Sequence, residues 1–516
     1  MLTFAVLRRI PNLLLWFVAI PAILLDSPPG FSQTPAGSGC LKLPSGASEQ
    51  EQWTWDRICA GQNANLQLQY GGTDNPKDAQ NWPTQRDLSR RFLVTILLND
   101  SYRNSIPPRG IVILGAHFPE TIDLSYAKLG RDLWLRQSRF EGDNADSLLM
   151  LKTEASGHLD FDGSVFTKGV NMGGLHADSL YLTNGSFVSV WLADAKFNLL
   201  RINDTTVSKS LEMSNLEVAT DFEMLMSTLV DVHLRSAKVG GHLEMEGPRN
   251  IKGSVCPNQE RKAPRPTYPS QSVDLSGATV GTLSFGSSCY GPFDAPNNWG
   301  SGATLILANA SVDTLQDGLC ANEESDCPVW PEHVELAGFK YLRLESSDAD
   351  KILDMAPRSV TWWTGWLGRQ RGRSAQPYEF LAARFMELGD KEKAEDILYA
   401  EKNQELKNTP FPGNTKLWLE RLFIGYGYRT QYSLIWAAGF VLLGASLLRL
   451  SREGPRNKMP YGFAFSFDML IPLVRLREYH YKVDLKGWIR YYFYFHKLMG
   501  FVLASFLVAG LSGLTK

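Results

Sequence analysis

The stretch VHLRSAKV, residues 232–239, contains the pattern that decides the fold. Val232 and Leu234 alternate with a polar residue as in a β-strand, and after a turn Ala237 and Val239 return to the apolar side. The two large apolar residues Leu234 and Val239 are five positions apart, and the small Ala237 stands two positions before the second. The stretch therefore predicts one short strand followed by one tight turn.

The same pattern recurs every ten or eleven residues from about residue 109. A recurrence this regular predicts a repeat fold. A large apolar residue every five positions, with a small one two positions before it, lets a chain wind into a narrow tube whose large side chains stack inside. We expect the eleven-residue units to add local bulges. The copies are IDLSYAKL, LWLRQSRF, LDFDGSVF, LYLTNGSF, VWLADAKF, LEMSNLEV, VDLSGATV and LILANASV.

On these motifs, region 109–346 resembles the pentapeptide-repeat family, and the resemblance implies a right-handed quadrilateral β-helix. Such a fold needs a cap at each end, because its terminal strands otherwise expose unpaired backbone groups. Three insertions, near 247–271, 287–303 and 313–333, interrupt the repeats. The Pro-rich, polar stretch CPNQERKAPRPTYPSQ of the first, residues 256–271, is predicted to be a surface loop held by its disulfide. The predicted fold class is mainly β, with a pentapeptide-repeat-like β-helix, a helical hairpin and a two-helix transmembrane C-terminal anchor.

The N-terminus has the layout of an export signal over residues 1–33. Arg8 and Arg9 precede the apolar run 12–25, which is short for a bilayer span, and a turn-rich stretch follows. Whether this signal is cleaved or stays as a membrane segment is left open. Residues 34–108 are then predicted to form a small N-terminal cap containing a disulfide.

The cysteine count agrees with export, because the six cysteines fall into sequence-local pairs in a chain with a signal. The alternative is a metal site, but no Cys-x-x-Cys spacing and no neighbouring histidine favours one. We therefore predict no metal site and three disulfides, Cys40–Cys59, Cys256–Cys289 and Cys320–Cys327.

The composition becomes helical after the repeats. Residues 374–408 predict an antiparallel helical hairpin, since two amphipathic stretches meet at Gly389 and Asp390. Segments 432–450 and 491–514 predict transmembrane helices, and 461–476 predicts a re-entrant or interfacial helix. These segments belong to a predicted membrane domain, 415–516.

The segment between the two predicted transmembrane helices carries nine Lys/Arg and four Asp/Glu from Arg449 to Arg490. The positive-inside rule places such a segment in the cytoplasm, and therefore places the repeats outside it. The export signal predicts the same topology from different residues.

Polar residues at membrane depth are expected to be structural or functional. Asp468 is predicted either to pair with Lys497 or a backbone group and so fix the packing, or to take part in ion or proton passage. The possible intramembrane polar site comprises Asp468, His496 and Lys497.

The stretch FIGYGYRT, residues 423–430, contains the Gly-Tyr-Gly triplet of potassium-channel filters. Arg421 and Arg429 flank the triplet and would repel cations at close range, which argues against a filter. We predict instead a hinge whose glycines turn the chain and whose aromatic and basic residues anchor at the interface. The predicted hinge and interface anchor are Gly425, Tyr426, Gly427, Tyr428 and Arg429.

Region 375–516 also resembles a group of uncharacterised bacterial membrane proteins with degenerate pentapeptide repeats. The motifs are PYEFLAARFMELGDKEKAEDILYAEKNQE, GYGYR, FSFDMLIPLVRL and FHKLMGFVLASFLVAGLSGL. Some members are labelled membrane-associated oxidoreductases, but the chain contains neither a Gly-x-Gly-x-x-Gly turn nor a Cys-x-x-Cys motif. We therefore predict no cofactor and no catalytic residue. The resemblance and the topology imply a bacterial inner membrane with the repeats on its extracytoplasmic side.

The charge of the chain is nearly balanced, with 52 Lys+Arg against 54 Asp+Glu, so no basic field favours nucleic acid as a partner. The expected partners are membrane lipid and either an envelope protein or a second copy of the chain. We expect a binding or scaffold protein of the cell envelope. The alternatives are an oligomeric channel or transporter component and an envelope enzyme that uses a groove along the repeats.

Overall fold

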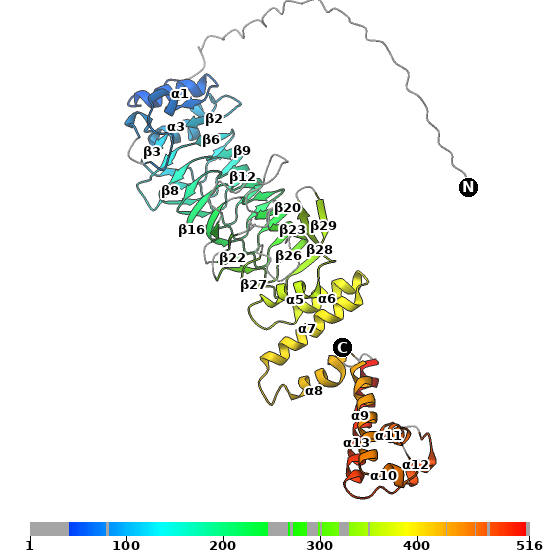
Figure 1. Ribbon diagram of the computed structural model, residues 1–516. Coiled ribbons are helices and arrows are strands. Elements are labelled where there is room, and N and C mark those ends of the chain that lie inside the picture. The colour runs from blue at the N-terminus through cyan, green and yellow to red at the C-terminus, as the bar shows by residue number, and fades with distance from the viewer. Residues whose placement is uncertain are drawn as a thin grey trace, which may run out of the picture. The chain divides into compact units, whose positions relative to one another are not determined.

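The structure is a computed structural model (Figure 1). The predicted export signal, five of the six cysteines and most of the three predicted insertions lie outside the residues that it describes. The described residues are 41–511 without 79–81, 226, 246–266, 269–271, 286–297, 300–301, 319–329, 349–350, 430, 460 and 472–474.

A small helical region precedes the repeats. Helix α1 begins with a capping box, in which the Ser48 hydroxyl accepts from the backbone of Glu51 and the Glu51 carboxylate accepts from the backbone of Ser48. Strand β1 (Ala64–Asn65) pairs with β2 (Ile111–Leu114), so this region supplies the first strand of a sheet. Its helices are α1 (Glu49–Cys59), α2 (Leu66–Tyr70), α3 (Arg90–Leu98) and α4 (Asp100–Arg103).

Two long sheets contain nearly all the described strands, and neighbouring strands in both are parallel except for β28 and β29. The larger sheet has the order β1, β2, β6 (Leu133–Arg136), β9 (Glu154–Asp160), β12 (His176–Tyr181), β15 (Lys196–Arg201), β17 (Glu217–Val218), β20 (Lys238–Met245), β23 (Thr279–Phe285), β26 (Ser311–Gly318), β28 (Lys340–Asp348), β29 (Lys351–Asp354), with β5 (Lys128–Leu129) and β18 (Phe222–Glu223) off this path. The smaller sheet has the order β27 (His333–Glu335), β25 (Thr304–Ile306), β22 (Ser272–Asp274), β19 (Thr228–His233), β16 (Thr206–Glu212), β13 (Ser186–Phe187), β10 (Val165–Phe166), β7 (Arg139–Phe140), β3 (His117–Phe118), with β4 (Ile122–Asp123), β8 (Asp146–Leu149), β11 (Gly169–Asn171) and β14 (Ser189–Trp191) off it. A third sheet pairs β21 (Thr267–Tyr268) with β24 (Asn298–Trp299).

Successive repeats stack in register in the larger sheet. Ala177 on β12 faces Phe197 on β15, and the side chain of Asn198 donates to that of Asp178, which is 20 residues earlier in the chain. The register shifts between Ala177 and Ser179 where β12 pairs with β9, as expected for repeats of unequal length.

The tight turns share one backbone feature, a residue with positive φ, which in most repeats directly precedes the small residue. Ser236, for example, has φ of 55° and precedes Ala237. This conformation is strained for most residues and favours Gly, Asn and Asp. The positive-φ positions in these turns are Tyr126, Gln137, Lys152, Gly163, Gly174, Asn184, Asp194, Asp204, Asn215, Ser236, Gly277, Asn309 and Gly338.

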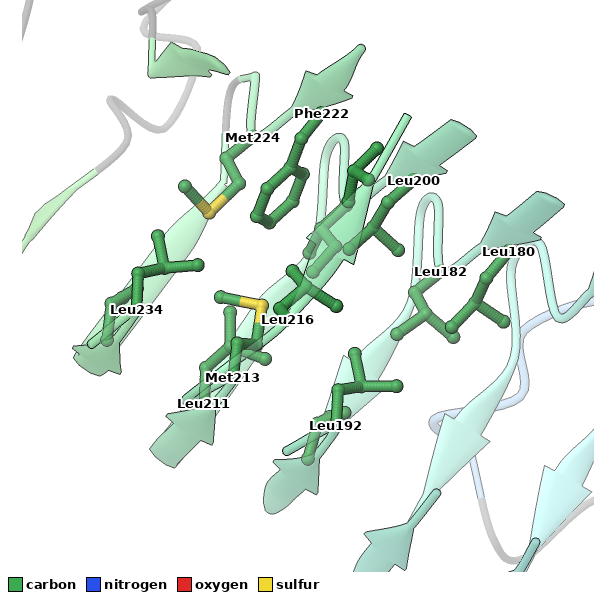
Figure 2. Packing of buried hydrophobic residues seen from close by; sticks show 14 of the residues in the cluster. Leu180, Leu182, Leu192, Leu200, Leu211, Met213, Leu216, Phe222, Met224 and Leu234 are labelled. Carbon is green, nitrogen blue, oxygen red and sulfur yellow. The ribbon is translucent and has the colours of Figure 1, made fainter. Parts of the chain in front are cut away.

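The apolar side chains of both sheets are directed toward one another and form the core, as Figure 2 shows. Large residues also stack from strand to strand within the smaller sheet. Phe118, Phe140, Phe166 and Phe187 lie with successive ring centroids 4.6, 4.3 and 4.9 Å apart. Each stacked pair contributes about 0.5–1.5 kcal/mol beyond the burial of its apolar area. The labelled residues in Figure 2 are Leu180, Leu182, Leu192, Leu200, Leu211, Met213, Leu216, Phe222, Met224 and Leu234, all of which are buried.

The C-terminal third is helical, so the chain is a mixture of α and β structure and not mainly β as predicted. Helices α9 and α13 are long and apolar enough to cross a membrane, and α11 packs against both. Within the described residues of the predicted segment 461–476, the helical part is α11. The helices are α5 (Val360–Gly368), α6 (Gln376–Glu387), α7 (Lys391–Asn408), α8 (Thr415–Ile424), α9 (Gln431–Leu450), α10 (Glu453–Arg456), α11 (Phe463–Leu470), α12 (Glu478–Lys482) and α13 (Trp488–Leu511).

Candidate functional site

A groove of about 1240 Å³ lies over the larger sheet. It is lined by strands β5, β9, β12, β15, β17 and β20 and by Arg103 of α4. Because the strands are parallel and in register, equivalent positions of successive repeats form rows along the groove. One row, which we call the charged row, comprises Lys128, Glu154, His176, Lys196, Glu217 and Lys238.

The charged row is joined by ion pairs between neighbouring strands. Lys128 lies 3.0 Å from Glu154, and the Glu217 carboxylate lies 2.8 Å from Lys196 and 3.2 Å from Lys238. Hydrogen bonds from the two lysines hold the pKa of Glu217 below its ordinary value. All five side chains are at least 39% exposed, so these pairs contribute little to stability and exchange readily for other partners.

Asp178, which lines the groove, contacts a serine and a histidine outside the lining, but not in a catalytic arrangement. Asp178 accepts a hydrogen bond from the hydroxyl of Ser179 at 3.1 Å, and its carboxylate lies 3.2 Å from Nδ1 of His158. In a Ser-His-Asp triad the histidine stands between the other two, whereas here the aspartate does. Within the described residues, no three His, Cys, Asp or Glu side chains are placed to hold a metal ion.

Asp468 lies on α11 and is fully buried. Its carboxylate accepts hydrogen bonds from the backbone N–H groups of Leu476 at 3.0 Å and Arg477 at 3.2 Å. Nδ1 of His480 on α12 lies 2.8 Å from the same carboxylate. Burial raises the pKa of Asp468, but these hydrogen bonds outweigh it and the net pKa is below the ordinary value. Sequence reasoning missed His480, because no spacing rule links it to Asp468.

One of our alternatives expected Lys497 to pair with Asp468, but the two residues do not pair. Its ammonium group lies 5.6 Å from the ring centroid of Tyr481. The Tyr481 hydroxyl donates to the backbone carbonyl of Asp468 at 3.2 Å. Asp468 therefore bonds to backbone groups and to a histidine, and its role in packing or in ion passage stays a prediction.

His496 is buried between α9, α11 and α13. Its Nε2 lies 2.9 Å from the backbone carbonyl of Ser466, and its Nδ1 lies 3.2 Å from the hydroxyl of Tyr492. The Ser466 hydroxyl in turn donates to the carbonyl of Val441 on α9. His496 on α13 and Asp468 on α11 thus lie where these two helices pack, but they bond to different groups.

The Gly-Tyr-Gly turn connects α8 to α9 and is fixed to α7. Gly425 ends α8 in the left-handed conformation, with φ of 52°, and Tyr426 has φ of 59°. The Tyr426 hydroxyl donates to Asn403 at 3.3 Å, and Arg429 forms an ion pair with Asp396. Burial raises the pKa of Tyr426 to about 12 and also raises the pKa of Tyr428. The predicted hinge is therefore a turn that contacts with α7 hold in place.

Of the predicted disulfide cysteines, Cys59 is described and takes part in a disulfide bond. Its pairing with Cys40 stays a prediction, because the other cysteines lie outside the described residues. These are Cys40, Cys256, Cys289, Cys320 and Cys327.

No protein-family model, curated protein or solved structure matches this chain. The two resemblances described for the sequence therefore rest on its motifs alone.

Proposed function

We propose that the chain is a membrane-anchored binding or scaffold protein of the bacterial cell envelope, whose parallel strands wind into a right-handed pentapeptide-repeat-like β-helix. The alternation of strands between the sheets supports the winding, since β15 belongs to the larger sheet, β16 to the smaller and β17 to the larger again. Between β12 and β20, the contacts Asp178–Asn198, Lys196–Glu217 and Glu217–Lys238 join side chains that are 20 or 21 residues apart, which is one coil of such a helix.

The groove is the single observation that carries the binding role. Members of its charged row are spaced as neighbouring strands are, about 4.8 Å apart, so an extended partner lying along the groove meets lysine, glutamate or histidine side chains at regular intervals. The ion pairs of the row are exposed, and a partner with both signs of charge can exchange with them at little cost.

The anchor is proposed to be α9 and α13, with the basic segment between them in the cytoplasm and the repeats outside. The composition of that segment supports this orientation, because its nine Lys/Arg outnumber its four Asp/Glu.

The channel alternative receives less support from the polar groups around these helices. The Asp468 carboxylate is engaged by backbone N–H groups and by His480, which leaves it poorly placed to bind a passing ion. A strict monomer in detergent would also exclude a pore, because two spanning helices per chain cannot enclose one.

The binding role is tested by isolating partners of the tagged full-length protein from membranes. We expect the double variant Lys196→Glu/Lys238→Glu to lose a partner that the wild type retains, because it reverses two charges of the row. Lys209→Glu is the matched control, since Lys209 is an exposed lysine of the smaller sheet, outside the groove. Partners that are identical for all three proteins would rule the groove out.

A further inference from the structure

Two cations converge on one aromatic ring beside α13. The guanidinium carbon of Arg475 lies 5.2 Å from the ring centroid of Tyr481, and the ammonium of Lys497 lies 5.6 Å from the same centroid. Both cations are exposed, and cation–π attraction holds each of them near the ring. Arg475 and Lys497 thus place two like charges within 6 Å of the centre of one ring.

No described carboxylate within ion-pair distance balances these two charges, since neither Arg475 nor Lys497 has an acidic partner among the described residues. Asp468 also contacts Tyr481, but its oxygens are taken up by Leu476 and Arg477 as well as by His480. An unbalanced pair of exposed cations attracts an anion, and phosphate oxygens are well matched to both guanidinium and ammonium donors.

The position of Lys497 indicates where that anion comes from. Lys497 lies about 13 Å along α13 from Trp488, at a helical rise of about 1.5 Å per residue. Beyond Lys497, α13 carries no charged residue as far as Leu511, and a charged side chain at the edge of such an apolar stretch must reach the headgroup region. Tyr491 and Tyr494, which are 72% and 64% exposed, lie on the preceding turns, as aromatic residues do at a membrane interface.

Apolar side chains continue along α13 directly beyond Lys497. Leu498, Phe501 and Val508 are 60%, 46% and 64% exposed. They offer the acyl chains of a lipid an apolar surface next to the two cations. A free phosphate ion has no acyl chain and cannot use this surface.

We propose that Arg475 and Lys497, positioned by the ring of Tyr481, bind the phosphate of an anionic phospholipid headgroup. The inference requires that α13 lies in the membrane but not that the repeats bind a partner. A failure of this lipid site therefore leaves the groove experiment unaffected, and the reverse also holds.

The test uses the full-length protein in a non-ionic detergent, with its thermal unfolding midpoint followed during titration with dioleoyl phosphatidylglycerol. Dioleoyl phosphatidylcholine and inorganic phosphate are titrated in parallel. We expect a saturable rise of the midpoint with phosphatidylglycerol alone. Arg475→Gln and Lys497→Gln should each raise the half-saturating lipid concentration about fivefold, the loss expected for one cation at an anionic surface.

Four further variants distinguish a specific lipid site from a general attraction between basic residues and anionic lipid. Arg475→Lys and Lys497→Arg keep the charge and should bind nearly as the wild type, whereas Tyr481→Leu should weaken binding as the Gln variants do. Lys486→Gln is the matched control, because Lys486 is exposed in the same basic segment but does not contact the ring. An equal loss in Lys486→Gln would show a general basic field in place of a site. Equal stabilisation by inorganic phosphate would overturn the lipid assignment.

Discussion

At the residue scale, the small position of the repeat has a second role where it is a serine. Ser164 is fully buried, and its hydroxyl donates to the carbonyl of Leu135 at 2.8 Å and accepts from the backbone N–H of Ser138 at 3.1 Å. The repeat pattern predicts a small residue here, because in most repeats a small side chain fits beside the large ones. It does not predict the hydrogen bonds, since alanine fills the same position in other repeats.

Ser164→Ala should lower the free energy of unfolding by about 1–3 kcal/mol, because it leaves two buried backbone groups without this partner. The measurement is urea unfolding of the full chain in detergent. Ser208→Ala is the control, since Ser208 is exposed on β16, and it should change stability by less than about 0.5 kcal/mol. Equal effects in the two variants would contradict the role of the buried hydroxyl.

Lys152 tests the positive-φ position, because it has φ of 49° with an exposed side chain. Lys152→Gly should be neutral or slightly stabilising, as glycine relieves backbone strain but loses more entropy on folding. Lys152→Val should lower the free energy of unfolding by about 1–2 kcal/mol, because a β-branched side chain is poorly tolerated there. Lys209→Val, in strand β16, should be nearly neutral. A neutral Lys152→Val would show that the turn adapts to the side chain.

At the element scale, strands were predictable and short helices were not. The repeat carries its own period, so strand positions follow from local sequence. Helix α5 lies in a stretch, 347–373, for which the sequence patterns predict no element. Its Trp362, Trp363 and Trp366 are buried, and the ring of Trp366 packs edge-on against Trp330 at 5.4 Å. These contacts join distant segments, and no local period reveals them.

Close packing of α11 against α13 depends on a glycine. A Cβ added at Gly500 would overlap the backbone carbonyl of Leu470, so Gly500→Ala must push the two helices apart. We expect a lower thermal midpoint of the detergent-solubilised protein. Gly439→Ala on α9 is the control, because a Cβ there meets nothing within 4 Å and alanine favours helix. Equal thermal midpoints for the two variants would contradict the claim that close packing of α11 against α13 needs Gly500.

The contact between α6 and α7 should weaken at alkaline pH. Tyr378 is buried, its hydroxyl donates to Gln404 at 2.6 Å, and burial raises its pKa to about 12. Because the folded pKa exceeds the unfolded value of about 10, the stabilisation is complete below pH 10 and is lost as the pH rises from about 10 to 12.

The loss attributable to Tyr378 should be about 2 kcal/mol over that range. Thermal midpoints between pH 8 and 12 measure it. Tyr378→Phe should flatten part of the decline, because phenylalanine does not titrate. An unchanged decline in Tyr378→Phe would assign the loss to other tyrosines.

At the scale of the whole molecule, the sequence predicted stacked parallel strands and two apolar helices, because both follow from periods and lengths within short windows. It did not predict what joins them. The contacts of Asp468 with His480 and of Arg429 with Asp396 link segments by tertiary packing, and neither has a spacing rule. The lipid site at Tyr481 escapes sequence reasoning for the same reason, although Lys497 stands out in the sequence as a polar residue at membrane depth.

The central claim is that the repeats lie outside the cytoplasm, held by α9 and α13, with the basic segment inside. Lys196→Cys, in the exposed charged row, and Lys458→Cys, between α9 and α11, place one added thiol on each predicted side. The measurement is labelling of each variant with a membrane-impermeant maleimide in bacterial cells whose outer membrane alone is permeabilised, with the unsubstituted protein as control. The account predicts that Lys196→Cys is labelled at once and Lys458→Cys only after the inner membrane is opened. Immediate labelling of Lys458→Cys with protection of Lys196→Cys would contradict it.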